Sequence, residues 1–227
     1  MFFDSFRSQL GRRGGAVLVG LALSAVAILP ANSVVADHEE AQFPLVVANN
    51  TLLPCLAKDP TDLRHPPTAE VNVERGDLND TLKLKLHNIK PGLAFDLFTI
   101  QRSNKLSDGS PDPNFKGSFG MAWYQSDIEA DHDGNANVTI KTILLDQIFG
   151  FDADLSNDKI NTFNVGFWFN DPNDAATCGF DVTKPTPFNG EHKAGPLAMI
   201  SLPDQQTGLG PLCRNPQSSS SGFVCNP

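Results

Sequence analysis

Residues 81–87, Thr-Leu-Lys-Leu-Lys-Leu-His, alternate between polar and apolar side chains without interruption. Successive side chains of a β-strand point to opposite faces, so the pattern places the three leucines on one face and the two lysines on the other. The segment therefore predicts a half-buried strand, and its buried face needs further strands to cover it.

Other segments share this strand-like composition and are separated by turn residues. They are residues 69–74, 95–100, 119–128, 138–144, 162–169 and 197–202. Pro91-Gly92 predicts a hairpin after residues 81–87, and Asp133-Gly134-Asn135 predicts another after residues 119–128. Residues 162–169 carry the bulkiest apolar row, with Trp168 on the opposite face, so we expect this strand at the centre of a sheet.

A short helix is predicted directly after that central strand. Asp171 is a typical N-cap, Pro172 suits the first helical position, and Gly179 suits the left-handed residue that ends a helix. Several short strands, turn signals and one short helix predict an all-β fold. We expect a single antiparallel β-sandwich domain, with a β-barrel as the alternative.

The N-terminal segment predicts export. Arg7, Arg12 and Arg13 precede an apolar run over residues 16–29, which is too short for a transmembrane helix of about 20 residues. Small residues up to Ala36 suit cleavage of this segment after export. We therefore expect the mature protein to have no transmembrane anchor and to be secreted or located in the cell envelope. The predicted parts are a signal peptide (1–36), a β-sandwich domain (37–213) and a Ser-rich tail (214–227) that is flexible unless a disulfide pins it.

The charge balance excludes one class of partner. Removal of residues 1–36 takes away three of the 17 Lys and Arg and one of the 26 Asp and Glu, which leaves a net charge of −11. A nucleic-acid partner requires a basic surface, and the remaining cations are not clustered. We expect an extracellular protein, a glycan or a small ligand as the partner.

All four cysteines follow the predicted signal peptide. An even number of cysteines in an exported chain predicts two disulfides, and the spacings do not suit a zinc site or a redox dithiol. Three pairings are possible. Chain entropy favours Cys213 with Cys225, which leaves Cys55 with Cys178.

Two loops are rich in the oxygen ligands that calcium prefers. The residues concerned are Asp127, Glu129, Asp131 and Asp133 in one loop, and Asp108 and Asp112 in the other. With Gly134 at the sixth position of an EF-hand loop, the twelfth position is Ile140 instead of the bidentate glutamate, which excludes an EF-hand. We favour ordinary acidic loops over calcium sites and expect no other cofactor.

Acid–base catalysis and ligand stacking are further hypotheses. The catalytic candidates are Glu129, His132, Glu191 and His192, with Asp127 and Asp131 as additional carboxylates. Trp123, Tyr124 and Trp168 form a candidate aromatic platform, although core packing is favoured for them. None of these residues belongs to a recognised catalytic motif.

The leading interpretation is a secreted, non-catalytic β-sandwich protein that acts in extracellular or envelope binding or structure. The alternatives are a secreted hydrolase that draws its acid and base from the loop residues above, and a calcium-stabilised adhesion module. Convergence of an acid and a base beside a pocket is the feature that would favour the hydrolase.

Overall fold

The computed structural model of the protein describes residues 42–62, 64–74, 76, 78–143, 149–151, 159–161, 164–187, 193–213, 216–220 and 222–225. These residues belong to one compact unit, Glu39–Pro227. The predicted signal peptide, residues 1–36, lies outside the described residues.

The elements follow one another in this order: β1 (Gln42–Val47), η1 (Asn50–Leu52), α1 (Leu53–Leu56), β2 (Thr68–Glu74), β3 (Asp80–His87), β4 (Ala94–Ile100), β5 (Ala122–Glu129), β6 (Ala136–Ile143), β7 (Phe149–Phe151), β8 (Lys159–Asn161), β9 (Asn164–Phe169), η4 (Pro172–Cys178), β10 (Leu197–Ser201), β11 (Pro216–Ser219) and β12 (Gly222–Cys225). Here η denotes a 3₁₀ helix. The predicted all-β fold class is confirmed.

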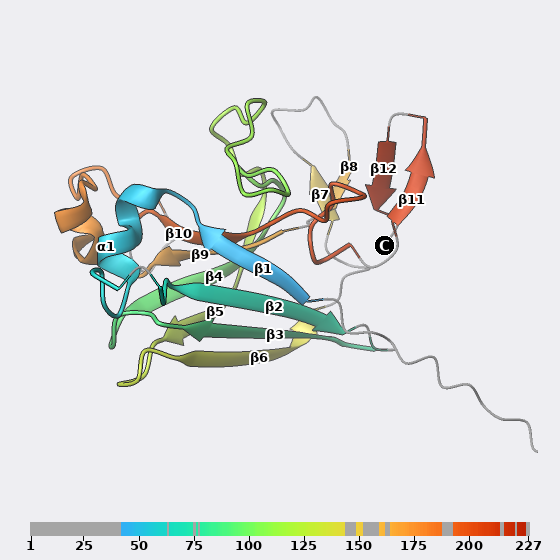
Figure 1. Cartoon of the computed structure of the whole chain (residues 1–227). Helices are drawn as coiled ribbons and strands as arrows, with labels where there is room; N and C mark the ends of the chain where they lie inside the picture. The colour runs from blue at the N-terminus through green and yellow to red at the C-terminus, as the bar shows by residue number, and fades with distance from the viewer. Residues whose placement is uncertain are drawn as a thin grey trace, which may run out of the picture. The chain divides into compact units, whose positions relative to one another are not determined.

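Eight of these strands form a single antiparallel sheet in the order β5-β4-β9-β10-β1-β2-β3-β6 (Figure 1). The two edge strands, β5 and β6, contact each other and are joined by the short loop at 130–135. The sheet therefore curls nearly into a barrel, which is the form that the sequence left as the alternative to two separate sheets. β9 lies in its interior, between β4 and β10, as its apolar row predicted.

The alternation of apolar and polar residues in the sequence corresponds to the two faces of this sheet. Leu82, Leu84 and Leu86 of β3 are fully buried in the main core. The lysines between them lie outside and form cross-strand ion pairs, Lys83 with Glu74 and Lys85 with Glu70. Such pairs on an exposed sheet face add little stability, so the buried leucines are what fix the position of β3.

Opposite β3, the core is aromatic. Val165, Phe167 and Phe169 of β9 are fully buried, and the rings of Phe95 and Phe167 meet edge-on with centroids 5.0 Å apart. This row is the one predicted from the sequence, except that Phe163 lies outside the described residues. Aromatic side chains of this size bury more apolar surface than any other residues, so this half of the barrel carries much of the core.

A second layer covers the outer face of β9. Trp168 is only 6% exposed, because Phe98 and Phe119 pack edge-on against its ring with centroids 5.5 and 5.7 Å away. Phe119 belongs to the long loop between β4 and β5. This apolar contact anchors the loop against the sheet.

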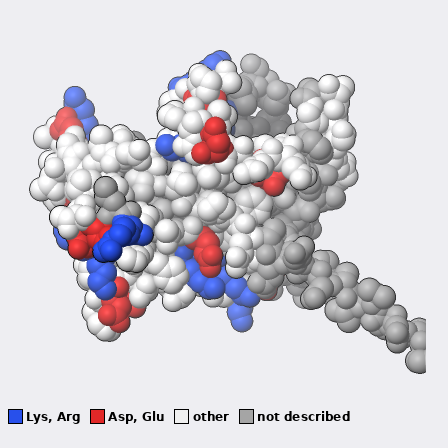
Figure 2. Space-filling model, viewed as in Figure 1, with Lys and Arg blue, Asp and Glu red and all other residues white. Residues whose placement is uncertain are grey.

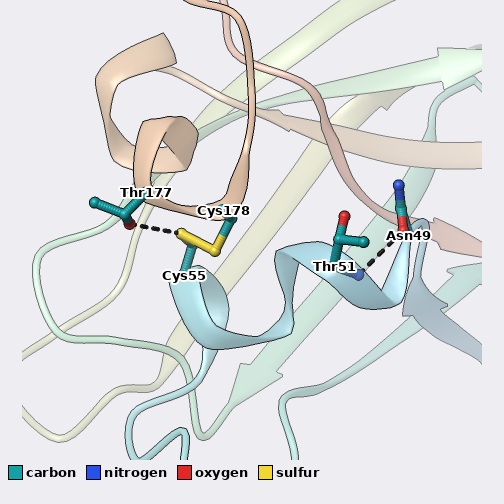
Figure 3. The surroundings of a disulfide bond; sticks show 5 residues. All are labelled: Asn49, Thr51, Cys55, Thr177 and Cys178. Atoms are coloured by element: carbon teal, nitrogen blue, oxygen red, sulfur yellow. Dashed lines mark hydrogen bonds between the residues drawn. A yellow bond between two sulfur atoms is a disulfide. The ribbon is translucent and has the colours of Figure 1, made fainter.

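The two predicted disulfides are both present. Cys55 of α1 is bonded to Cys178 at the end of η4, and Cys213 is bonded to Cys225. Figure 3 shows the first of them, with Thr177 Oγ1 3.3 Å from the Cys55 sulfur. The pairing favoured by chain entropy is therefore confirmed, and disulfides of this kind fit a protein of an oxidising compartment.

The predicted short helix is η4. Its N-cap is Asp171, whose Oδ1 accepts a hydrogen bond from the backbone N–H of Asn173, and Gly179 ends it with φ of 90°. The helix is 3₁₀ and not α, a form common in pieces this short. α1 and η1 were not predicted; the turn begins where Asn49 Oδ1 accepts a hydrogen bond from Thr51 N–H (Figure 3).

The C-terminal segment contains a hairpin, and the disulfide that could pin the predicted Ser-rich tail is present. β11 and β12 pair from Pro216 with Cys225 to Ser219 with Gly222, and the Cys213–Cys225 disulfide closes the base. In the part of the chain that the structure describes, no helix has the length and apolar character needed to span a membrane.

Candidate functional site

A pocket of about 700 Å³ lies at one end of three neighbouring strands, where β4 and β10 end and β9 begins. One wall is the loop after β4 and the other is the loop after β10. The lining residues are Gln101, Arg102, Ser103, Lys105, Leu106, Ser107, Asp112, Asn114, Phe115, Lys116, Ser118, Asn164, Pro203, Asp204, Gln205, Gly208, Leu209 and Gly210. This volume is typical of sites for small ligands.

Local hydrogen bonds give the first wall a defined shape. Asp108 Oδ1 accepts a hydrogen bond from Ser110 N–H, and Asp112 Oδ1 accepts one from Asn114 N–H. Leu106 N–H also donates to Ser110 O across the loop. The alternate oxygen-bearing residues that suggested a cation site are thus turn-forming residues in this structure.

The second wall is organised by one carboxylate. Asp204 Oδ1 accepts hydrogen bonds from the N–H groups of Gln206 and Thr207 and from the Thr207 hydroxyl, at 2.8–3.0 Å. These bonds favour the charged form, and the backbone bond from Thr207 is the main reason that the pKa of Asp204 lies below its ordinary value. Asp204 therefore holds the turn at 204–209 in its shape.

We expect Asp204→Ala to lower the free energy of unfolding by about 1 kcal/mol at neutral pH, because three hydrogen bonds lose their acceptor. The pKa of Asp204 is lower in the folded chain than in the unfolded chain, so its contribution is present above the ordinary carboxyl pKa and is lost as the pH falls below it. Urea unfolding of both proteins at about pH 7 and about pH 2 tests this. A difference that persists unchanged in acid would contradict the assignment.

A buried amide lies at the floor of the pocket. Asn164, the first residue of β9, is 5% exposed, and its Nδ2 donates to the backbone oxygen of Gln101 at 3.3 Å. Its Oδ1 is buried and has no hydrogen-bond partner in the structure. An unsatisfied buried acceptor costs about 1–3 kcal/mol, so a donor that reaches it would be strongly favoured.

Gln101 links Asn164, at the floor of the pocket, to the end of the β4–β5 loop. Gln101 Oε1 accepts a hydrogen bond from Met121 N–H, next to Gly120, whose φ is 72°. A Cβ on Gly120 would lie 2.0 Å from Gln101 Oε1. Gly120 is thus required both for its backbone conformation and for the space that Gln101 occupies.

We therefore expect Gly120→Ala to destabilise the protein by about 2 kcal/mol, and Gly117→Ala by only about 1 kcal/mol. Gly117 is a matched control, because its φ of 84° imposes the same backbone strain while a Cβ there would meet nothing within 4 Å. Chemical denaturation of the two variants measures the difference. Equal destabilisation would show that the contact with Gln101 is unimportant.

The charged residues of the pocket differ in whether they already have a partner among the described residues. The two carboxylates, Asp112 and Asp204, accept hydrogen bonds from their own loops. Lys105 and Lys116 form no ion pair with any residue that the structure describes. Figure 2 shows cationic and anionic side chains on the part of the surface that the β4–β5 loop forms. Lys105 and Lys116 therefore favour a negatively charged ligand.

The acidic hairpin between β5 and β6 is shaped by its own backbone. Asp131 Oδ1 accepts hydrogen bonds from the N–H groups of Asp133 and Asn135, and the bond from Asn135 is the main cause of a lowered Asp131 pKa. Asp127 accepts a hydrogen bond from the Tyr124 hydroxyl. Over the described ranges, no three His, Cys, Asp or Glu side chains are grouped to hold a metal ion.

The catalytic candidates do not form a described site. His132 is highly exposed and lies 3.3 Å from Asp133, its neighbour in the chain, and Glu129 is exposed on β5. Glu191 and His192 lie outside the described residues. Glu129 and His132 do not line the pocket.

The three aromatic candidates have different environments. Trp168 is packed beneath Phe119, Trp123 is half-buried, and Tyr124 is 49% exposed with its ring against Phe98. They contribute nothing to the lining of the pocket. Among the described residues, the aromatic residue that lines it is Phe115, which the sequence places in a polar loop without marking it as a ligand contact.

Comparison with known proteins gives no assignment, since no protein-family model matches the chain and a search of curated proteins yields no match. The function must therefore be argued from the residues of the pocket. Sequence reasoning missed this pocket because its two walls are more than 80 residues apart in the chain. In the sequence, only the calcium candidates Asp108 and Asp112 drew attention to the first wall.

Proposed function

We propose that the chain is an exported, non-catalytic binding protein whose pocket between the β4–β5 loop and the 203–210 loop holds a small molecule. The observation that carries this proposal is the pocket itself. It is concave, has a volume of about 700 Å³, and combines apolar side chains from both loops, Leu106, Phe115 and Leu209, with a larger number of polar side chains. These are the features of ligand sites, which often occupy the mouths of β-barrels.

The construction of the site supports ligand binding by a rigid scaffold. The first wall is anchored to the sheet by the Phe119–Trp168 contact, and the second lies directly before Cys213 and its disulfide. A site fixed in this way loses little conformational entropy when a ligand enters. Export, predicted from residues 1–36, agrees with the two disulfides.

Binding is favoured over hydrolysis by the protonation chemistry of the pocket. A hydrolase needs a general acid and a general base within hydrogen-bond reach of a substrate. Among the described residues that line the pocket, Asp112 and Asp204 are the two carboxylates, both are held by backbone N–H groups, and there is no histidine. Hydrogen bonds that favour the charged form make Asp204 a poor proton donor.

A thermal-shift panel tests the proposal. The purified protein would be heated with neutral sugars, sugar acids, sugar phosphates, amino acids and short carboxylates at millimolar concentration. A ligand that binds only the folded chain raises the melting temperature. We expect at least one class to do so, without release of any cleavage product.

The matched variant is Leu209→Trp, which fills the pocket from its second wall. It should retain the melting temperature of the wild type and lose the shift that the ligand produces. If no class stabilises the wild type, or if the filled variant responds equally, the pocket is not a binding site. Steady formation of a product from a bound compound would favour the hydrolase instead.

A further inference from the structure

We infer that the ligand of this pocket is a hydroxylated organic anion, a sugar acid or a sugar phosphate. The inference rests on the function proposed above and names its ligand class. Three independent properties of the lining define that class: two lysines, Lys105 and Lys116, that have no ion pair among the described residues, hydroxyl and amide groups that need partners, and apolar side chains.

The cations require an anion. Although the chain carries a net charge of −9, the described lining of the pocket holds Lys105 and Lys116 as well as two carboxylates, Asp112 and Asp204. Both carboxylates are occupied by their own loops, and neither Lys105 nor Lys116 is neutralised by a carboxylate in the described part of the chain. A carboxylate or phosphate between the lysines would form charge-assisted hydrogen bonds, which are about twice as strong as neutral ones.

The floor and the first wall require hydroxyl groups. Asn164 Oδ1 is a buried acceptor without a donor, which a carboxylate or phosphate cannot supply but an O–H group can. Ser103 Oγ and Ser118 Oγ accept hydrogen bonds from the N–H groups of Lys105 and Gly120. Each serine hydroxyl therefore keeps its proton to donate to an oxygen of the ligand.

The remaining surface suits the C–H face of a sugar ring. Leu106, Phe115 and Leu209 provide the apolar part of the lining, and Leu106 is 41% exposed. The ring of Phe115 is held by Phe119, with centroids 4.9 Å apart, so it is a fixed surface. A simple inorganic anion would leave this wall and the Asn164 acceptor without partners.

Isothermal titration calorimetry tests the inference: glucuronate, glucose 6-phosphate, glucose and acetate are each titrated into the purified protein. We expect both sugar anions to bind at least about tenfold more tightly than glucose or acetate, because tenfold corresponds to about 1.4 kcal/mol, which one hydrogen bond to a charged group can supply. Binding should weaken as salt is added. Whichever sugar anion binds more tightly identifies the carboxylate or the phosphate as the preferred group.

The variant Lys105→Gln/Lys116→Gln should lose about tenfold in affinity for both anions, whereas Lys141→Gln, on the exposed face of β6, should lose none. Glucose binding as tightly as the anions would overturn the inference but leave the proposed binding function intact. Acetate binding as tightly would overturn the hydroxyl requirement. If none of the four binds and the thermal-shift panel is also negative, the proposed function falls with the inference.

Discussion

Replacing Cys55 and Cys178 together with alanine should lower the free energy of unfolding by about 4 kcal/mol. The bond joins residues 123 apart in the sequence, so its loss frees a very long loop in the unfolded chain. In the chain-entropy account, a closed loop of about 100 residues contributes about 4.7 kcal/mol. Cys55 is also buried in the main core, where α1 packs against η4.

Cys213→Ala/Cys225→Ala is the matched control. That disulfide spans only 12 residues and closes one hairpin, so its removal should cost about 3 kcal/mol or less. Guanidinium unfolding of the two double variants and of the wild type measures both effects. A larger loss from the short-range disulfide would contradict the idea that the long-range bond ties the start of the barrel to its second half.

Phe167→Ala should lower the free energy of unfolding by about 4 kcal/mol. Phe167 is fully buried on β9, between β4 and β10, and its ring meets that of Phe95 in the main core. Its truncation removes a large apolar surface and leaves a cavity that rigid strands on both sides cannot close. The melting temperature and the urea midpoint should both fall.

Tyr124→Ala is the control for that experiment. Tyr124 is half exposed on the edge strand β5, and its ring also meets an aromatic partner, Phe98, with centroids 5.7 Å apart. Loss of an exposed aromatic residue should cost about 1 kcal/mol. Similar effects of the two substitutions would mean that the core is not centred on β9.

Side-chain alternation predicted most of the sheet. β3 was expected over residues 81–87 and spans Asp80–His87, and β10 was expected over 197–202 and spans Leu197–Ser201. β3 has one face in the main core and one face outside it, so its sequence alternates between apolar and polar residues. β10 is buried along its whole length, so its sequence is mostly apolar. The same logic placed Trp168 opposite the buried row, and the covering layer proved to be the β4–β5 loop.

β1 was missed because of its proline. A proline cannot donate to a sheet hydrogen bond, and it usually argues against an interior strand. β1 does pair on both sides, but its partners on β10 begin only at Leu45, whereas Pro44 pairs with Glu70 of β2. The first part of β1 therefore pairs with β2 and the last part with β10, and only Leu45 has a partner in both strands, an arrangement that no local pattern shows.

For a similar reason, the candidate site could not be predicted from local sequence patterns. Lys105 and Asp204 lie in loops with no periodicity, and the folding of the sheet brings both loops to the same pocket. The acidic loops, by contrast, attracted attention through composition alone. Their carboxylates are used to shape turns, as with Asp131 and Asp112.

The most direct test of the pocket as a binding site is a ¹H–¹⁵N correlation spectrum recorded during titration with the compound that stabilises the protein most. We predict that the largest shifts fall on the amides of residues 101–118, Asn164 and 204–210. Largest shifts at the acidic hairpin, residues 130–135, or on the outer face of β3 would contradict the assignment of the pocket.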